Sequence, residues 1–155
     1  MMHVNTYEFV ENIPSAEALA NLRKLVGWRE IDERSMAKGL ANSLYAVFVK
    51  VEEEVIGTAR VVGDSSTCFY IQDVIVKPGC QGLGIGTTMM HKVMDFIGEN
   101  ACTGATIGLM SAKGKEGFYE KFGFRRRPSE SFGHGMFQLW IPKKEAAGGE
   151  WSRNE

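Results

Sequence analysis

The fold of this chain is decided by residues 74–97, VIVKPGCQGLGIGTTMMHKVMDFI. The stretch opens with β-branched residues that favour a largely buried strand, and Pro78-Gly79 end that strand. Apolar residues then recur with the spacing of a helix, at Ile85, Met89, Val93 and Phe96. The stretch therefore predicts a strand, a glycine-rich turn and a helix, in that order.

The turn leads directly into a predicted helix N-terminus, which is a natural place for an anion. The first N–H groups of a helix lack intrahelical acceptors, and the helix dipole adds partial positive charge there. Gly82, Gly84 and Gly86 carry no side chains that would keep a bulky anion away from these N–H groups. The turn therefore predicts a site for phosphate or pyrophosphate.

The spacing of the turn separates several families that use glycine-rich loops. A P-loop requires Lys and Ser/Thr after its last glycine, and no Lys follows Gly84 or Gly86. The dinucleotide-binding fingerprint requires a third Gly or Ala, where this chain has Thr87. What remains is residues 81–86, QGLGIG, which fits Gln/Arg-x-x-Gly-x-Gly/Ala. It resembles the pyrophosphate-binding motif of the GCN5-related N-acetyltransferase (GNAT) superfamily.

A second stretch strengthens this resemblance. Residues 117–124, GFYEKFGF, are similar to the closing helix of the superfamily, Phe-Tyr-x-x-x-Gly-Phe. The two motifs occur in the family's order, and the resemblance covers about residues 4–141. It implies an α/β fold with a central mixed β-sheet, in which two parallel strands splay apart and helices flank the sheet. It also implies a single acyltransferase domain over residues 1–142, and residues 143–155 are polar and are expected to form a flexible tail.

The rest of the chain is expected to supply the remaining elements of such a fold. Capping residues and apolar periodicity predict helices from Ala16 to about Val26 and over residues 33–41. Alternating or continuous apolar runs predict strands over residues 4–10, 44–51, 55–62, 69–76, 105–110 and 136–141. A short helix is predicted around Tyr119, with Gly123 as its left-handed cap.

Composition limits the classes of partner. A chain of 155 residues with 44% hydrophobic content can bury one core, and a net charge of −1 offers no general attraction to nucleic acid or anionic membrane. No apolar run is long enough to span a membrane, and the N-terminus does not look like a signal peptide. Three cysteines without a Cys-x-x-Cys pair argue against a disulfide framework and a zinc site. We therefore expect a cytoplasmic protein without a bound metal.

The resemblance implies acetyl-CoA as the co-substrate. In the family, the turn holds the pyrophosphate, and the exposed edge of the central strand pairs with the pantetheine arm as an added strand would. Here the strand contributes Val74, Ile75 and Val76, and Val74 is a candidate to polarise the thioester carbonyl. The turn contributes Gln81, Gly82, Leu83, Gly84, Ile85, Gly86 and Thr87.

The resemblance also assigns catalytic roles. Tyr119 corresponds to the general acid that protonates the departing thiolate. Many relatives carry Glu or His at the position of Gln72, and an amide cannot take up a proton at useful pH. Gln72 is instead a candidate to orient a water, and His134 is a second candidate for the base. Strand alternation predicts that Asp73 faces away from Gln72.

The expected function is an N-acetyltransferase that moves an acetyl group from acetyl-CoA to a primary amine of a small molecule or peptide by direct attack. The alternative is a non-catalytic acyl-CoA-binding sensor, which the amide at Gln72 favours. A nucleotide-binding protein is a third possibility. Relatives in the family often dimerise, so a homodimer is one option, and the sequence does not fix the amine acceptor or the oligomeric state.

Overall fold

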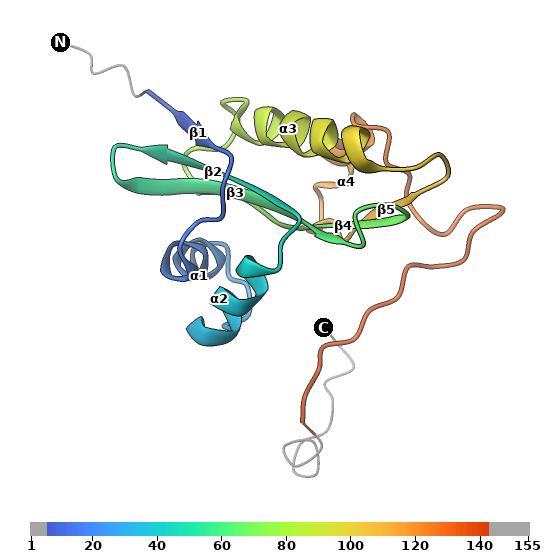
Figure 1. The fold of residues 1–155 in the computed structure, drawn as a ribbon, viewed down its shortest axis with the longest axis horizontal. Helices are drawn as coiled ribbons and strands as arrows, with labels where there is room; N and C mark the ends of the chain where they lie inside the picture. Colours follow the sequence, from blue (N-terminus) through green and yellow to red (C-terminus); the bar gives the residue numbers. More distant parts are fainter. Residues whose placement is uncertain (1–5, 143–155) are drawn as a thin grey trace. The chain divides into compact units, whose positions relative to one another are not determined.

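The computed structural model describes residues 6–142, which form two compact units that divide between Ala112 and Lys113. Each unit is described by itself. The first unit is a five-stranded sheet flanked by helices, and Figure 1 shows its elements. It confirms the predicted α/β fold with a mixed sheet.

The sheet has the strand order β1-β2-β3-β4-β5. Its first four strands are antiparallel neighbours, and β4 and β5 are parallel. The strands are β1 (Glu8–Val10), β2 (Tyr45–Val51), β3 (Glu54–Gly63), β4 (Cys68–Val76) and β5 (Thr106–Leu109). Each was predicted, although β1 begins later than expected, and residues 4 and 5 of its predicted range lie outside the described residues.

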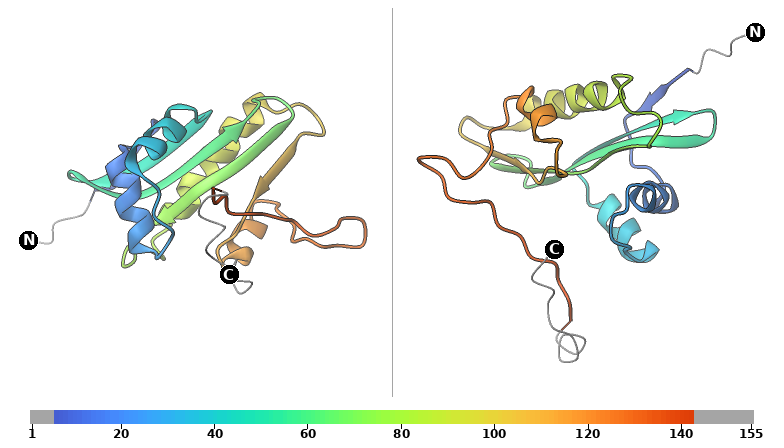
Figure 2. Two further views of the ribbon diagram at one scale, coloured as in Figure 1. Left: turned by 90° about the horizontal axis from the view of Figure 1, so that it is seen from below. Right: turned by 180° about the vertical axis from the view of Figure 1, so that it is seen from behind.

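Helices cover both faces of this sheet, as Figures 1 and 2 show. Helices α1 (Ala16–Leu25) and α2 (Glu33–Ala41) lie on one face, and α3 (Ile85–Asn100) lies on the other. The side chains of Ser15 and Asp32 cap α1 and α2 by accepting hydrogen bonds from backbone N–H groups. The core between α1, α2 and the sheet is made by Leu19, Leu22, Met36, Leu40 and Ile75.

Strand β4 contains a β-bulge. Arg60 of β3 pairs with Gln72 and Thr58 pairs with Ile75, so two residues, Asp73 and Val74, stand opposite Ala59 alone. Asp73 has a φ of 54°, in the left-handed region that only Gly, Asn and Asp adopt readily. The extra residue interrupts the alternation of side chains along the strand.

The bulge corrects the prediction that Asp73 faces away from Gln72. Gln72 is directly opposite Arg60, whose side chain bonds to the end of α2, so Gln72 lies on the face that α1 and α2 cover. Asp73 bonds to Arg23 of α1 and therefore lies on the same face. Regular alternation fails here because the bulge inserts one residue between the two register positions.

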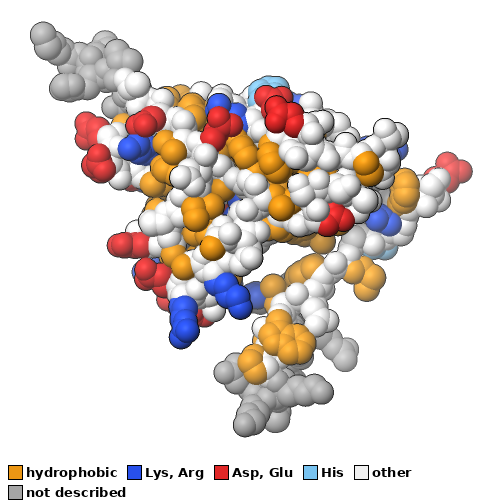
Figure 3. Space-filling model, in the orientation of Figure 1, with side chains coloured by type: hydrophobic (Ala, Val, Ile, Leu, Met, Phe, Trp, Pro, Cys, Tyr) orange, Lys and Arg blue, Asp and Glu red, His pale blue; other side chains and the backbone are white. Residues whose placement is uncertain are grey.

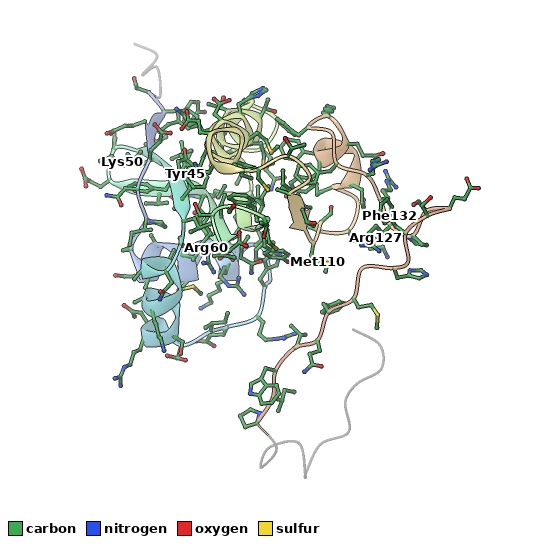
Figure 4. All side chains as sticks on the ribbon, turned by 45° about the vertical axis from the view of Figure 1, so that its right-hand side comes forward. Tyr45, Lys50, Arg60, Met110, Arg127 and Phe132 are labelled. Atoms are coloured by element: carbon green, nitrogen blue, oxygen red, sulfur yellow. The ribbon has the colours of Figure 1, made fainter. Side chains whose placement is uncertain are left out.

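The second unit contains α4 (Glu116–Glu120) and a set of aromatic rings. Tyr119 packs edge-on against Phe118 and Phe124, with ring centroids 5.1 and 6.3 Å apart. Gly123 follows with a φ of 89°, which confirms the predicted left-handed cap. Beyond it, Arg127 lies beside the ring of Phe132, as Figure 4 shows.

The predicted last strand is wrong. Residues 136–141 form no strand within the described chain, and Met136 and Trp140 are exposed by 87% and 76%. The apolar run that suggested a strand, MFQLWI, describes side chains alone, and a strand also needs a partner for its backbone. The predicted tail, residues 143–155, lies outside the described residues.

The surface is mixed in charge. On the face drawn in Figure 3, acidic and basic side chains are interspersed. None of the helices within residues 6–142 is long and apolar enough to cross a membrane.

The first prediction concerns the packing of α1 on the sheet. Leu22 is 1% exposed and Leu25, on the same helix, is 53% exposed. We expect Leu22→Ala to lower the free energy of unfolding by about 2–5 kcal/mol, because it leaves a cavity in the core. Leu25→Ala serves as the control and should change it by less than about 0.5 kcal/mol. Urea unfolding measures both, and equal effects would contradict the assigned packing.

Candidate active site

The N-terminus of α3 has no side-chain cap among the described residues, whereas those of α1 and α2 are capped by Ser15 and Asp32. We call the uncapped end open. Gly84 is the N-cap residue of α3, with a φ of 81°. The first helical bond runs from the N–H of Thr88 to the carbonyl of Gly84 at 3.0 Å. The N–H groups of Ile85, Gly86 and Thr87 therefore precede the intrahelical ladder and need other acceptors.

The electrostatics of this turn suit an anion. The first turn of α3 has no acidic residue, whereas the first turns of α1 and α2 carry Glu17 and Glu33. The positive end of the helix dipole is thus not compensated by a neighbouring carboxylate. Gly82 has a φ of 81°, and a Cβ added at Gly82 or Gly84 would meet no atom within 4 Å. The space beside both glycines is open for a ligand.

Gln81 ties the turn to the end of β4. Its side-chain amide donates a hydrogen bond of 3.0 Å to the carbonyl oxygen of Val76. Just before it, the N–H of Cys80 bonds to the carbonyl of Lys77 at 2.9 Å and closes a tight turn. The first residue of the predicted motif therefore links the end of the strand to the turn before the open helix end.

The edge of β4 that faces β5 is paired over only half its length. Parallel pairing joins Cys68–Ile71 to Thr106–Leu109 and stops there. From Gln72 to Val76, this edge has no partner strand among residues 6–142. The two parallel strands therefore separate at Gln72, and a row of backbone groups is left for a ligand.

The direction of these backbone groups follows from the other edge of β4. The N–H of Lys77 bonds to the carbonyl of Ile56 at 2.7 Å, on the β3 side. Because backbone groups alternate in direction along a strand, those of Ile75 also point toward β3. Those of Val74 and Val76 then point to the free edge, and the carbonyl of Val76 is already bonded to Gln81. Of the three strand residues predicted for cofactor binding, Val74 and Val76 are oriented for hydrogen bonds.

Gln72 lies at the point where the strands part. Tyr70, two residues earlier on the same strand face, is half-buried, and burial raises the pKa of its hydroxyl. The negative charge of Asp73 raises the pKa of Tyr70 further, while a hydrogen bond from the Met110 backbone opposes this. Tyr70 is thus a hydroxyl that stays protonated beside Gln72, and the sequence analysis did not single it out.

The sequence analysis also missed a buried ion cluster below the bulge. Asp73 bonds to Nη1 of Arg23 at 2.6 Å and to Nε of Arg60 at 2.8 Å. The signal that could have found it is a single arginine within an apolar element. Arg60 interrupts the apolar run of β3, and Arg23 neighbours Leu22 on α1. Figure 4 shows Arg60 on the side of the sheet toward α1 and α2.

Tyr119 lies on α4 in the second unit. It is 8% exposed, and this burial raises the pKa of its hydroxyl above the ordinary value of 10.0. A tyrosine with a raised pKa is protonated at neutral pH, so Tyr119 carries a proton that a general acid could donate.

A comparison with models of known families assigns the chain to one of them. A model described as the acetyltransferase (GNAT) family matches residues 10–124. The chain belongs to the GNAT family. Both of the predicted motifs lie within the matched residues.

Named relatives agree with this assignment. The uncharacterized N-acetyltransferase ycf52 of Pyropia yezoensis is 28% identical over 129 residues, covering 81% of this chain and 71% of that protein. The chloroplastic serotonin N-acetyltransferase 2 of Oryza sativa subsp. japonica is 33% identical over 81 residues, covering 52% of this chain and 39% of that protein.

Solved structures share the fold. A Staphylococcus aureus protein of unknown function, named a probable acetyltransferase, has a TM-score of 0.80 and is 29% identical, covering 87% of this chain and 100% of that chain. Glucosamine-6-phosphate N-acetyltransferase of Arabidopsis thaliana has a TM-score of 0.64 at 14% identity, covering 88% and 99%. The second likeness supports the fold alone.

Other residues of this GNAT protein have charged or reactive side chains that could serve a site. His134 is exposed in the second unit. Arg126 pairs with Glu120 at 2.6 Å, and Arg127 donates a hydrogen bond to the carbonyl of Gly133 at 2.6 Å. Cys80 is a free thiol in the turn. Two of the three consecutive arginines at residues 125–127, Arg126 and Arg127, are therefore engaged in local contacts.

A second prediction concerns the backbone of the turn. Gly84→Ala should lower the free energy of unfolding by about 1–2 kcal/mol, because alanine is strained in the left-handed region. Gly98→Ala is a matched control in the same helix, at an exposed site where a Cβ also meets no atom within 4 Å. It should raise stability by about 0.5–1 kcal/mol, since alanine favours the helix interior. Chemical unfolding measures both, and equal effects would contradict the assigned cap geometry.

Proposed function

We propose that this GNAT protein is an acetyl-CoA-dependent N-acetyltransferase that acetylates a primary amine of a small molecule or peptide. The observation that carries the proposal is the uncapped N-terminus of α3 directly after the unpaired half of the β4 edge. One end of the site suits a diphosphate and the other suits a chain of amides. Pyrophosphate and pantetheine are joined in that order in coenzyme A.

The residues of the turn and strand divide the binding work. The N–H groups of residues 82–87 would hold the diphosphate, and Gly82 and Gly84 would let it approach the backbone. Val74 and Val76 would pair with the pantetheine amides along the free edge. Because the Val76 carbonyl already accepts from Gln81, its N–H is the group left for the ligand.

The proposed reaction is a direct acyl transfer. The amine nitrogen bonds to the acetyl carbon, the carbon–sulfur bond breaks, and the electron pair leaves on the CoA sulfur. Tyr119 would give its proton to that thiolate. The proton lost by the amine would pass to a water that Gln72 orients, since the Gln72 amide is not itself a base. Positioning of the two reactants supplies much of the acceleration.

The acceptor class is proposed from the relatives. Rice serotonin N-acetyltransferase 2 is named for an arylalkylamine, and its similarity includes about half of this chain. Residues 117–124 are also similar to the closing helix of arylalkylamine acetyltransferases. Arylalkylamines are therefore the first acceptors to test.

A third prediction tests Tyr119 as the general acid. Tyr119→Phe should lower kcat by about 10²- to 10⁴-fold while the KM for acetyl-CoA stays nearly constant. Tyr45→Phe is the control, because Tyr45 is a half-buried tyrosine of the first unit whose hydroxyl donates a hydrogen bond to Glu11. It should leave kcat unchanged in a thiol-release assay. An unchanged kcat in Tyr119→Phe would remove Tyr119 from the mechanism.

A fourth prediction follows from the raised pKa of Tyr119. The acid form is the protonated one, and burial moves its loss to a pH above the ordinary value of 10.0. The kcat of the wild type should therefore not decline from about pH 7 to about pH 9. A decline in that range that Tyr119→Phe abolishes would show a pKa below the ordinary value and would contradict the raised pKa.

The alternative, a non-catalytic acyl-CoA-binding sensor, is favoured by one observation, the amide at Gln72 where a carboxylate or imidazole would serve as base. Thiol release from acetyl-CoA decides between the two. The panel should contain serotonin and other arylalkylamines, aliphatic polyamines and a peptide N-terminus. Amine-dependent thiol release supports the enzyme, and binding of CoA without turnover at any pH supports the sensor.

A further inference from the structure

The buried cluster of Arg23, Asp73 and Arg60 has no role in the chemistry proposed above. The side chain of Asp73 is 1% exposed, and those of Arg23 and Arg60 are 11% and 14% exposed. Each carboxylate oxygen of Asp73 accepts from a different arginine. Removing three charged groups from water costs free energy. A buried cluster in which both carboxylate oxygens of Asp73 are paired therefore indicates a structural role at this position.

That place is the bulge of β4. Asp73 is the bulge residue with a φ of 54°, and the pairing of β4 with β5 ends two residues earlier, at Ile71. Immediately after it come Val74 and Val76, whose backbone groups point to the free edge. The cluster thus lies between the paired and the unpaired halves of the strand.

The two arginines anchor Asp73 to three other elements. Arg60 comes from β3 and donates from Nη1 to the carbonyl of Gly39 and the hydroxyl of Ser43, at 3.4 and 3.3 Å. Arg23 comes from α1, donates from Nη2 to the carbonyl of Arg29 at 3.2 Å, and lies over the ring of Trp28 at 5.4 Å. The carbonyls and the ring offset the surplus positive charge of two arginines on one carboxylate.

We propose that Asp73, held by Arg23 and Arg60, is a positioning residue that fixes the β4 bulge and so aims the backbone of Val74 and Val76 at the pantetheine arm. The inference rests on the proposed function, because it assumes that acyl-CoA binds along this edge. The cluster itself does not touch the ligand. It acts through the strand backbone.

The physical reason is the alternation of a β-strand. A shift of one residue in register reverses the direction of every backbone and side-chain group beyond it. If the bulge relaxed into regular pairing, the groups of Ile75 would turn toward the free edge and those of Val74 and Val76 toward β3. The same shift would move Ile75 out of the core it shares with Leu19 and Leu22. The ion pairs oppose this shift by fixing one bulge residue to α1 and β3.

The test uses a double variant, Asp73→Asn with Arg60→Gln, which removes one charge of each sign and leaves the net charge of the cluster unchanged. Asparagine also tolerates the left-handed conformation, so residue 73 can keep its positive φ in this variant. We expect the Kd for CoA and the KM for acetyl-CoA to rise by about ten-fold or more, with the KM for the amine unchanged. Calorimetry and the thiol-release assay measure these quantities.

A second readout separates positioning from mere stability. In the wild type, CoA should protect the amides of Val74 and Val76 from hydrogen exchange, as followed by NMR, and in the folded double variant this protection should be lost. Ile97→Ala is the control, because Ile97 is 1% exposed near the C-terminal end of α3, on the face of the sheet opposite α1 and α2. It should lower Tm and leave the Kd for CoA and the protection pattern unchanged.

The outcomes are distinguishable. A folded double variant with wild-type CoA affinity and wild-type protection of Val74 and Val76 overturns this inference and leaves the proposed function intact. A wild type that binds no CoA overturns the proposed function and the inference with it. If the double variant does not fold, Arg60→Lys keeps the charge and loses the forked contact. It should then show a smaller rise in the Kd for CoA, and an unchanged Kd with unchanged protection would overturn the inference.

Discussion

The proposed cofactor site depends on backbone N–H groups at the start of α3 that lack intrahelical acceptors. Helices α1 and α2 close their N-termini with Ser15 and Asp32, whereas α3 begins at Gly84 with no capping side chain. Polar groups without acceptors are costly when they are enclosed, and they are useful when an anion can reach them. In this GNAT protein the open helix end follows a strand edge that is also unpaired, and our proposal is that the two bind one ligand together.

The strand edge is open because β4 and β5 part after Ile71, and the bulge at Asp73 coincides with that separation. The bulge is also the place where β4 is bonded to its neighbours. The carboxylate of Asp73 joins β4 to α1 and β3, and Gln81 joins the end of β4 to the turn before α3. Side-chain hydrogen bonds therefore hold both ends of the proposed cofactor site. Asp73 holds the strand end, and Gln81 holds the turn.

The sequence predicted the elements whose signals are local. Helix α2 has the predicted bounds because Asp32 caps it and Asn42 follows it, and the turn at residues 81–86 is specified by its glycines. The bulge could not be predicted, since no glycine marks it and the two arginines that bond to Asp73 lie 13 and 50 residues away in sequence. The last strand was predicted wrongly because an apolar run does not reveal a pairing partner. The assignments of Tyr119, Gln72 and the turn residues remain predictions that only ligand binding and kinetics can test.

A crystal structure of the protein with coenzyme A tests the central claim most directly. The account predicts diphosphate oxygens within hydrogen-bonding distance of N–H groups in residues 82–87, and a pantetheine arm along the free edge of β4 beside Val74 and Val76. A turn without diphosphate, with the ligand held elsewhere or the amides of residues 82–87 pointing away from it, would contradict it.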